Sequence, residues 1–135
     1  MDPAIRAALE HGTRIDLTTT GRHSGEPRTI EIVYHNVDGR IVISGSPSPR
    51  RRAWLYNIDA DPAITIHFKG PSAHGDITGT AREVTDPADR RHLLEAVARN
   101  WQRTDVDVMM EHSPLIEIDL PGYRSEPGSP STAPG

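Results

Sequence analysis

Alternation of apolar and polar residues with a period of two is the feature that most constrains the fold of this chain. Residues 13–19 carry Ile15 and Leu17 between polar neighbours, and residues 28–37 continue the pattern. Such alternation is typical of half-buried strands, because successive side chains of a strand point to opposite faces. Further segments of this kind cover residues 63–68, 75–85 (weakened by Gly79) and 115–120, and residues 40–44 form a short apolar strand. The sequence therefore predicts about six antiparallel strands.

Turn and helix signals separate these strands. Asp38-Gly39 is a strong signal for a two-residue hairpin. Asp2 and Asp86 each precede a proline and are expected to cap helices, the latter with Asp89 in an acidic variant of the capping box. Helices are predicted over residues 4–10, 50–58 and 86–103. Strands dominate and do not alternate regularly with helices, so the pattern favours a mainly β fold, a small antiparallel barrel with flanking helices.

The length of 135 residues fits one domain. Residues 121–135 hold four Pro and three Gly and have almost nothing to bury. We therefore predict a single domain over residues 1–120 and a disordered tail over 121–135. The first residues contain no long apolar run, which predicts neither a signal peptide nor a transmembrane segment and favours a cytoplasmic protein. Peripheral contact with a membrane stays open.

The charge and cysteine content exclude several classes of function. The net charge of −4 argues against a nucleic-acid partner, because such domains usually present a broad basic face. The chain has no cysteine, so disulfides, thiolate metal ligands and thiol nucleophiles are excluded together. An oxidoreductase built on this chain would have to borrow its redox centre from a bound cofactor.

Five arginines lie in two short stretches. Arg22 and Arg28 flank the turn between the first two strands, and Arg50, Arg51 and Arg52 follow a loop that contains two prolines. Planar guanidinium forks bind phosphate and carboxylate groups through paired hydrogen bonds. If the turn and the loop meet at one end of the barrel, the five side chains form an anion site. The alternative is that they are solvated, some of them paired with nearby carboxylates.

Histidine and acidic residues do not form a metal-binding pattern. The seven histidines are scattered, and surface positions are expected for them. His67 and His74 could meet across a hairpin near Asp76. The acidic segment at residues 105–112 lacks a metal-loop spacing and is expected to be solvated. We predict no metal site.

The two tryptophans are expected to differ in role. Trp101 follows Val97 at helical spacing, which is typical of a core position. Trp54 comes directly after the arginine cluster and could form the wall of a planar ligand site.

The segment Leu17–Arg28, which includes the run TTTGRHSGEPR, resembles the opening motif of the deazaflavin-dependent nitroreductase family. These are split β-barrel, FMN-binding-like oxidoreductases that use coenzyme F-420. The resemblance continues through residues 34–44, then through the Trp-Leu-Tyr-Asn segment that begins at Trp54 and through Asp61-Pro62, and covers residues 13–85.

The resemblance implies that reduced F-420 passes a hydride to a small-molecule acceptor such as a quinone, an enone or a nitro compound. It places the cofactor's phosphate and glutamate tail near the arginines, the ribityl chain near the loop 44–52, and the ring near Trp54. The implied cofactor-binding residues are Arg22, Arg28, Ser44, Gly45, Ser46, Arg50, Arg51, Arg52, Trp54 and Asn57. Tyr34 is a candidate proton donor, and no firm catalytic residue is assigned.

One loop departs from the family pattern. Members usually read Ser-Lys-Gly-Gly where this chain reads Ser44-Gly45-Ser46-Pro47, so the lysine is missing. Two alternatives therefore stay open: an FMN-dependent oxidoreductase of the same fold, and a non-catalytic module that binds a flavin, haem or lipid. The protein is expected to be a monomer or a homodimer.

Overall fold

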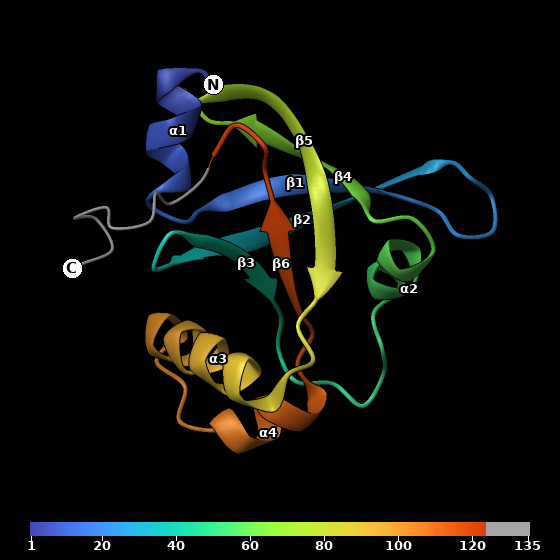
Figure 1. The fold of residues 1–135 in the computed structure, drawn as a ribbon, viewed down its shortest axis with the longest axis vertical. Coiled ribbons are helices and arrows are strands. Elements are labelled where there is room, and N and C mark those ends of the chain that lie inside the picture. The colour runs from blue at the N-terminus through green and yellow to red at the C-terminus, as the bar shows by residue number, and fades with distance from the viewer. Residues whose placement is uncertain (124–135) are drawn as a thin grey trace.

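Six antiparallel strands close into a barrel in the computed structural model, which describes residues 1–123 (Figure 1). The strands follow one another around the barrel in the order β1-β2-β3-β6-β5-β4. The prediction of a mainly β barrel with six strands and flanking helices is confirmed. In chain order the elements are α1 (Pro3–Leu9), β1 (Arg14–Thr20), β2 (Pro27–Val37), β3 (Arg40–Ser44), α2 (Ala53–Ala60), β4 (Ala63–Lys69), β5 (His74–Glu83), α3 (Pro87–Trp101), α4 (Val106–His112) and β6 (Leu115–Asp119).

The inside of the barrel is filled by the apolar residues of the alternating pattern. Ile15 and Leu17 of β1 are fully buried, as are Ile66 of β4 and Ile43 of β3. Burying one such aliphatic side chain contributes about 1.5–3 kcal/mol to stability. The period-two pattern therefore sets which face of each strand points inward.

A second apolar core lies outside the barrel, between its wall and the helices α3 and α4 (Figure 1). Val42 of β3 belongs to this core, together with Leu93 and Val97 of α3. Met109 of α4 is fully buried in the same core. The expected solvation of residues 105–112 holds for Asp107, Glu111 and His112, which are exposed. It does not hold for Met109, whose burial stabilises a two-turn helix there.

The hairpin turn and one strand glycine have clear geometric reasons. Asp38 and Gly39 both adopt a positive φ, +54° and +86°, as a type I′ turn between β2 and β3 requires. Gly79 lies where β5 passes β6: an added Cβ would come within 2.4 Å of the carbonyl oxygen of Asp119. Glycine at this position therefore permits the close approach of the two strands that closes the barrel.

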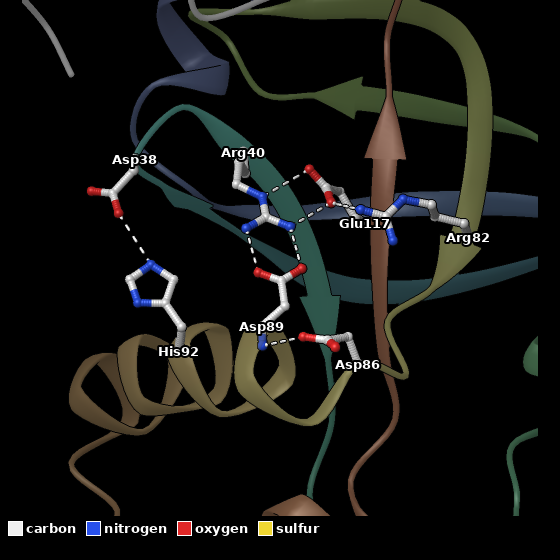
Figure 2. Close-up of polar contacts among 7 residues, drawn as sticks. All are labelled: Asp38, Arg40, Arg82, Asp86, Asp89, His92 and Glu117. Atoms are coloured by element: carbon white, nitrogen blue, oxygen red, sulfur yellow. Dashed lines mark hydrogen bonds and ion pairs between the residues drawn. The ribbon is translucent and has the colours of Figure 1, made fainter.

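Aspartate caps begin two of the helices, as predicted. The Asp2 carboxylate accepts a hydrogen bond from the backbone N–H of Ala4 at 2.8 Å, and Asp86 accepts one from that of Asp89 at 2.9 Å. The capping box also predicted a reciprocal hydrogen bond from the backbone N–H of Asp86 to the Asp89 carboxylate, and this prediction is wrong. The Asp89 carboxylate instead accepts two hydrogen bonds from Arg40 on β3, at 2.7 and 2.8 Å (Figure 2).

The described residues extend past residue 120, the predicted end of the domain. Tyr123 forms a bridge with Leu120, and its hydroxyl lies 3.0 Å from the side-chain amide of Asn36. The remainder of the predicted tail, residues 124–135, lies outside the described residues. Among the residues that are described, no helix is both long and apolar enough to span a bilayer.

Candidate functional site

Asn57 brings the β1–β2 loop and α2 together on one side of the barrel (Figure 1). Its side-chain oxygen accepts a hydrogen bond from the backbone N–H of Arg22 at 3.0 Å. Its amide donates to the hydroxyl of Thr19 at 3.1 Å. Asn57 and Thr19 are buried, so these bonds are shielded from water and fix the start of the loop against the helix.

A cavity of about 540 Å³ opens between this loop and α2. We call it the α2 cavity. Its wall combines cations with aromatic rings and includes Arg22, Arg28, Arg51, Trp54, Tyr56 and Asn57. The combination suits a ligand that carries both a planar group and anionic groups.

The arginines of the α2 cavity differ in what they already bind. The guanidinium of Arg51 is held by Glu83 at 3.0 Å and by Asp59 at 2.6 Å, and these contacts raise its pKa above the usual range. Arg28 contacts only uncharged groups, the hydroxyl of Ser24 and a backbone carbonyl. Within residues 1–123, neither Arg22 nor Arg28 forms an ion pair with a carboxylate. Their charges are therefore available to an anionic ligand.

A second cavity, of about 190 Å³, lies on the other side of Arg51, against the end of α4. We call it the α4 cavity. Arg50 and Arg52 line it and have no carboxylate partner in the described part of the chain; Arg52 donates to the carbonyl of Ser46 at 2.7 Å. Ser113 also lines it, and its buried hydroxyl has no hydrogen-bond partner among the described residues.

Arg90 of α3 fixes the wall of the α4 cavity. Its guanidinium donates to the backbone carbonyls of Met109, Met110 and Ser113, which lie at and just beyond the C-terminal end of α4. Burial lowers the pKa of Arg90, because desolvation disfavours the charged form. Arg90 therefore ties α3 to the turn between α4 and β6.

The structure brings together seven of the ten predicted cofactor-binding residues around these two neighbouring cavities. The α2 cavity is lined by Arg22, Arg28, Arg51, Trp54 and Asn57. The α4 cavity is lined by Arg50, Arg52 and again Arg51. The helix expected from Arg50 begins only at Ala53, so the three consecutive arginines precede α2. All three line the α4 cavity, and Arg51 also lines the α2 cavity.

The other three predicted residues shape the loop between β3 and α2 and line neither cavity. Ser44 is buried, and its hydroxyl donates to the carbonyl of Pro114 at 2.6 Å. At Gly45 an added Cβ would come within 3.0 Å of the Arg52 guanidinium and 3.1 Å of the Pro114 ring. The Ser46 carbonyl accepts the bond from Arg52. These residues hold the loop against the turn before β6.

Tyr34 does not reach either cavity. It is fully buried in the barrel core, and its hydroxyl donates to the carbonyl of Ala8 beneath α1. Burial raises the pKa of Tyr34 well above its usual value. Its assignment as a proton donor to a ligand is therefore not supported, because neither the hydroxyl nor its proton faces the site.

Tyr56 is the residue of the site that the sequence left unassigned. Its ring lies 4.3 Å from the guanidinium carbon of Arg22 and 5.0 Å from that of Arg51. The sequence did contain a signal for Tyr56, because this residue belongs to the Trp-Leu-Tyr-Asn segment that resembles the family. That its ring faces the cavity, however, is seen only once α2 is placed in the structure.

The histidines do not form a metal centre in the described part of the chain, which holds no group of three metal-ligating side chains. His67 does meet Asp76 across the β4–β5 pair, at 2.8 Å, and its other nitrogen lies 2.7 Å from the hydroxyl of Thr18. His35 departs from the expected surface position: it is buried beside Trp101, beneath α3.

A wider hollow of about 890 Å³ lies on the outer wall over β3, β6 and β5. Its two arginines, Arg40 and Arg82, are both paired with Glu117 (Figure 2). Because these charges are already satisfied within the protein, the hollow is a weaker candidate for an anionic ligand than the two cavities beside α2.

The closed six-stranded antiparallel barrel with its flanking helices is the split β-barrel fold. A family model described as F420H(2)-dependent quinone reductase matches residues 4–116, and the chain belongs to this family. The family resemblance seen in the sequence is thereby confirmed.

Individual relatives agree with this assignment. A relative from Mycobacterium tuberculosis with the same description is 34% identical over 87 residues, which cover 62% of this chain and 56% of the relative. The chain thus spans about half the length of that relative. Among solved structures, a conserved hypothetical protein of M. tuberculosis superposes with a TM-score of 0.69 at 21% identity, covering 90% of this chain and 81% of that one. An F-420 reductase superposes with a TM-score of 0.63 at 16% identity, covering 90% and 93%. These two likenesses show the fold.

Proposed function

We propose that this protein binds reduced coenzyme F-420 beside α2 and reduces a quinone-type acceptor. The observation that carries the proposal is the set of four arginines without carboxylate partners in residues 1–123, two in each of two neighbouring cavities. Membership of a family described by this activity supports the choice of ligand and acceptor.

The residues present fit such a cofactor. Arg22 and Arg28 offer guanidinium forks to the phosphate and glutamate groups of its tail. Arg50 and Arg52 offer two more in the α4 cavity. The loop also lacks the lysine usual in the family, and these two arginines supply positive charge in its place.

The cofactor and the protein contribute different parts of the proposed reaction. When bound, the coenzyme supplies the hydride, which no side chain of this cysteine-free protein can provide. The chain binds and orients: Trp54 gives an apolar wall for a planar group, and the arginines fix the anionic tail.

A ligand comparison tests the proposal. Purified protein is titrated with F-420 and, separately, with FMN, and binding is followed by fluorescence. We expect F-420 to bind with a Kd below about 10 μM and more tightly than FMN. We also expect menadione, a soluble quinone, to be reduced by F-420 in its reduced form. Tighter binding of FMN would overturn the choice of cofactor. Binding of F-420 without turnover of any quinone, enone or nitroaromatic would favour a non-catalytic binding module.

The cytoplasmic location and the monomeric or homodimeric state stay predictions. Sedimentation of the purified chain with and without F-420 would test the second.

A further inference from the structure

Two guanidinium groups meet on one exposed ring of the α2 cavity. Tyr56, on α2, is 37% exposed, and the guanidinium carbons of Arg22 and Arg51 lie 4.3 and 5.0 Å from its ring centre. Both distances fall within the range of a favourable cation–π contact. The ring thus links an arginine of the β1–β2 loop to an arginine that precedes the helix.

The two arginines are held in different ways. Arg51 donates to both oxygens of Glu83 on β5 and to Asp59 on α2, so its position does not depend on the ring. For the Arg22 guanidinium, the contact with Tyr56 is the one interaction recorded among residues 1–123. The backbone of Arg22 is fixed by Asn57, but its long side chain is oriented by the ring.

This difference decides which charge can serve a ligand. An ion pair orients a guanidinium but occupies its N–H groups and neutralises it. Contact through the face of a ring orients the planar fork and leaves its five N–H donors free for an incoming oxyanion. Because the Arg22 side chain is already ordered, it loses less conformational entropy when a ligand binds, and the affinity is correspondingly higher.

We propose that Tyr56 is a positioning residue whose ring holds Arg22 ready to bind the anionic tail of the coenzyme. The inference rests on the proposed function, and it assigns the role to the aromatic ring and not to the hydroxyl. It predicts that affinity depends on the ring only when the ligand carries its phosphate and glutamate groups.

The test compares Tyr56→Leu with Tyr56→Phe. Two probes are titrated by fluorescence: F-420, and the deazaflavin chromophore that lacks the phosphate and the glutamate tail. We expect Tyr56→Phe to bind F-420 within about twofold of the wild type, because the ring is kept. Tyr56→Leu should bind F-420 about 3- to 30-fold more weakly, which corresponds to one cation–π contact. Both variants should bind the tail-less chromophore as the wild type does.

Arg22 provides the second arm, which leaves Tyr56 in place and so does not depend on the folding of Tyr56→Leu. Arg22→Lys keeps the charge but loses the planar fork, and it should weaken F-420 binding about as much as Tyr56→Leu does. The double variant should be no weaker than Arg22→Lys alone, because the two residues act as a unit.

Several outcomes would overturn the inference while leaving the function intact. These are F-420 affinity unchanged in Tyr56→Leu, an equal loss in Tyr56→Phe, or an equal loss for the tail-less probe. Failure of the wild type itself to bind F-420 would instead overturn the proposed function, and the role of Tyr56 with it.

Discussion

Replacing Arg40 by methionine should loosen the first turn of α3 from the barrel wall. The guanidinium of Arg40 donates to both oxygens of Asp89 on α3, at 2.7 and 2.8 Å, and to both oxygens of Glu117 on β6, at 3.0 and 2.7 Å (Figure 2). Methionine keeps most of the aliphatic length and removes all four bonds. The variant therefore isolates the charge from the packing of the side-chain stem.

The size of the effect follows from the burial of the three side chains. Breaking a fully buried ion pair costs about 3–5 kcal/mol, and an exposed pair contributes about 0–1 kcal/mol. The side chains of Arg40, Asp89 and Glu117 are 29%, 30% and 19% exposed, which places this cluster between the two limits. We expect a loss of about 2–3 kcal/mol in the free energy of unfolding and a fall in Tm of about 6–12 °C.

Arg82→Met is the matched control. Arg82 contacts the same carboxylate, Glu117, but its side chain is 62% exposed, so its loss should cost less than about 1 kcal/mol. Both variants are measured by urea unfolding at neutral pH. Equal stabilities for the two variants would show that burial does not set the strength of these ion pairs.

The pH dependence gives a second check on the same cluster. Hydrogen bonds from Arg40 hold the pKa of Asp89 below its usual value, so the folded state binds the proton less readily than the unfolded state. The contribution is then fully present above a pH of about 4 and is lost as the pH falls further. The difference in stability between wild type and Arg40→Met should therefore shrink as the pH falls below about 4.

Three further predictions concern the site and the second core. Arg28→Glu should weaken F-420 binding by at least about tenfold and leave Tm within about 2 °C, because Arg28 is exposed and has no carboxylate partner in residues 1–123; an unchanged Kd would remove Arg28 from the site. Asn57→Ala should lower the free energy of unfolding in urea by about 1–3 kcal/mol, because the Thr19 hydroxyl and the Arg22 N–H lose their buried partner. The variant should also raise the Kd for F-420. A variant with wild-type stability and affinity would show that Asn57 does not hold the β1–β2 loop against α2. Burial lowers the pKa of His35, so stability should fall as the pH drops below about 6.5; His35→Leu should flatten the dependence between pH 7.5 and 5.5, and an equally steep loss in that variant would show that another group titrates.

The sequence predicted the framework of the site better than its details. The Asp38-Gly39 turn fixes the register of β2 and β3, and the alternation in β1 fixes which residues point inward, because both are local properties of the backbone. The sequence offered the meeting of the first hairpin and the loop before α2 only as a condition, and the structure places their arginines around two neighbouring cavities. Local sequence patterns could not predict the direction in which individual side chains point around these cavities.

Tyr34 and Ser44 show why. Tyr34 stands on the apolar face of an alternating strand, and Ser44 ends a short apolar strand. The structure shows where their hydroxyls bond: one lies under α1 and the other donates to the turn before β6. Their partners, Ala8 and Pro114, are 26 and 70 residues away along the chain. Contacts across such separations depend on how the barrel closes and not on the flanking sequence.

The strands, their inward faces, the main hairpin and the stretches of arginine that can bind an anion could thus be predicted from the amino-acid sequence. Which of those arginines are free became clear from the folded barrel alone. Arg51 is neutralised by Glu83 of β5, whereas Arg22 is oriented by the ring of Tyr56 and meets no carboxylate within residues 1–123. The physical reason is that alternation and turn chemistry act through neighbouring residues, whereas the pairing of charges depends on which distant side chains the closed barrel brings within hydrogen-bonding distance.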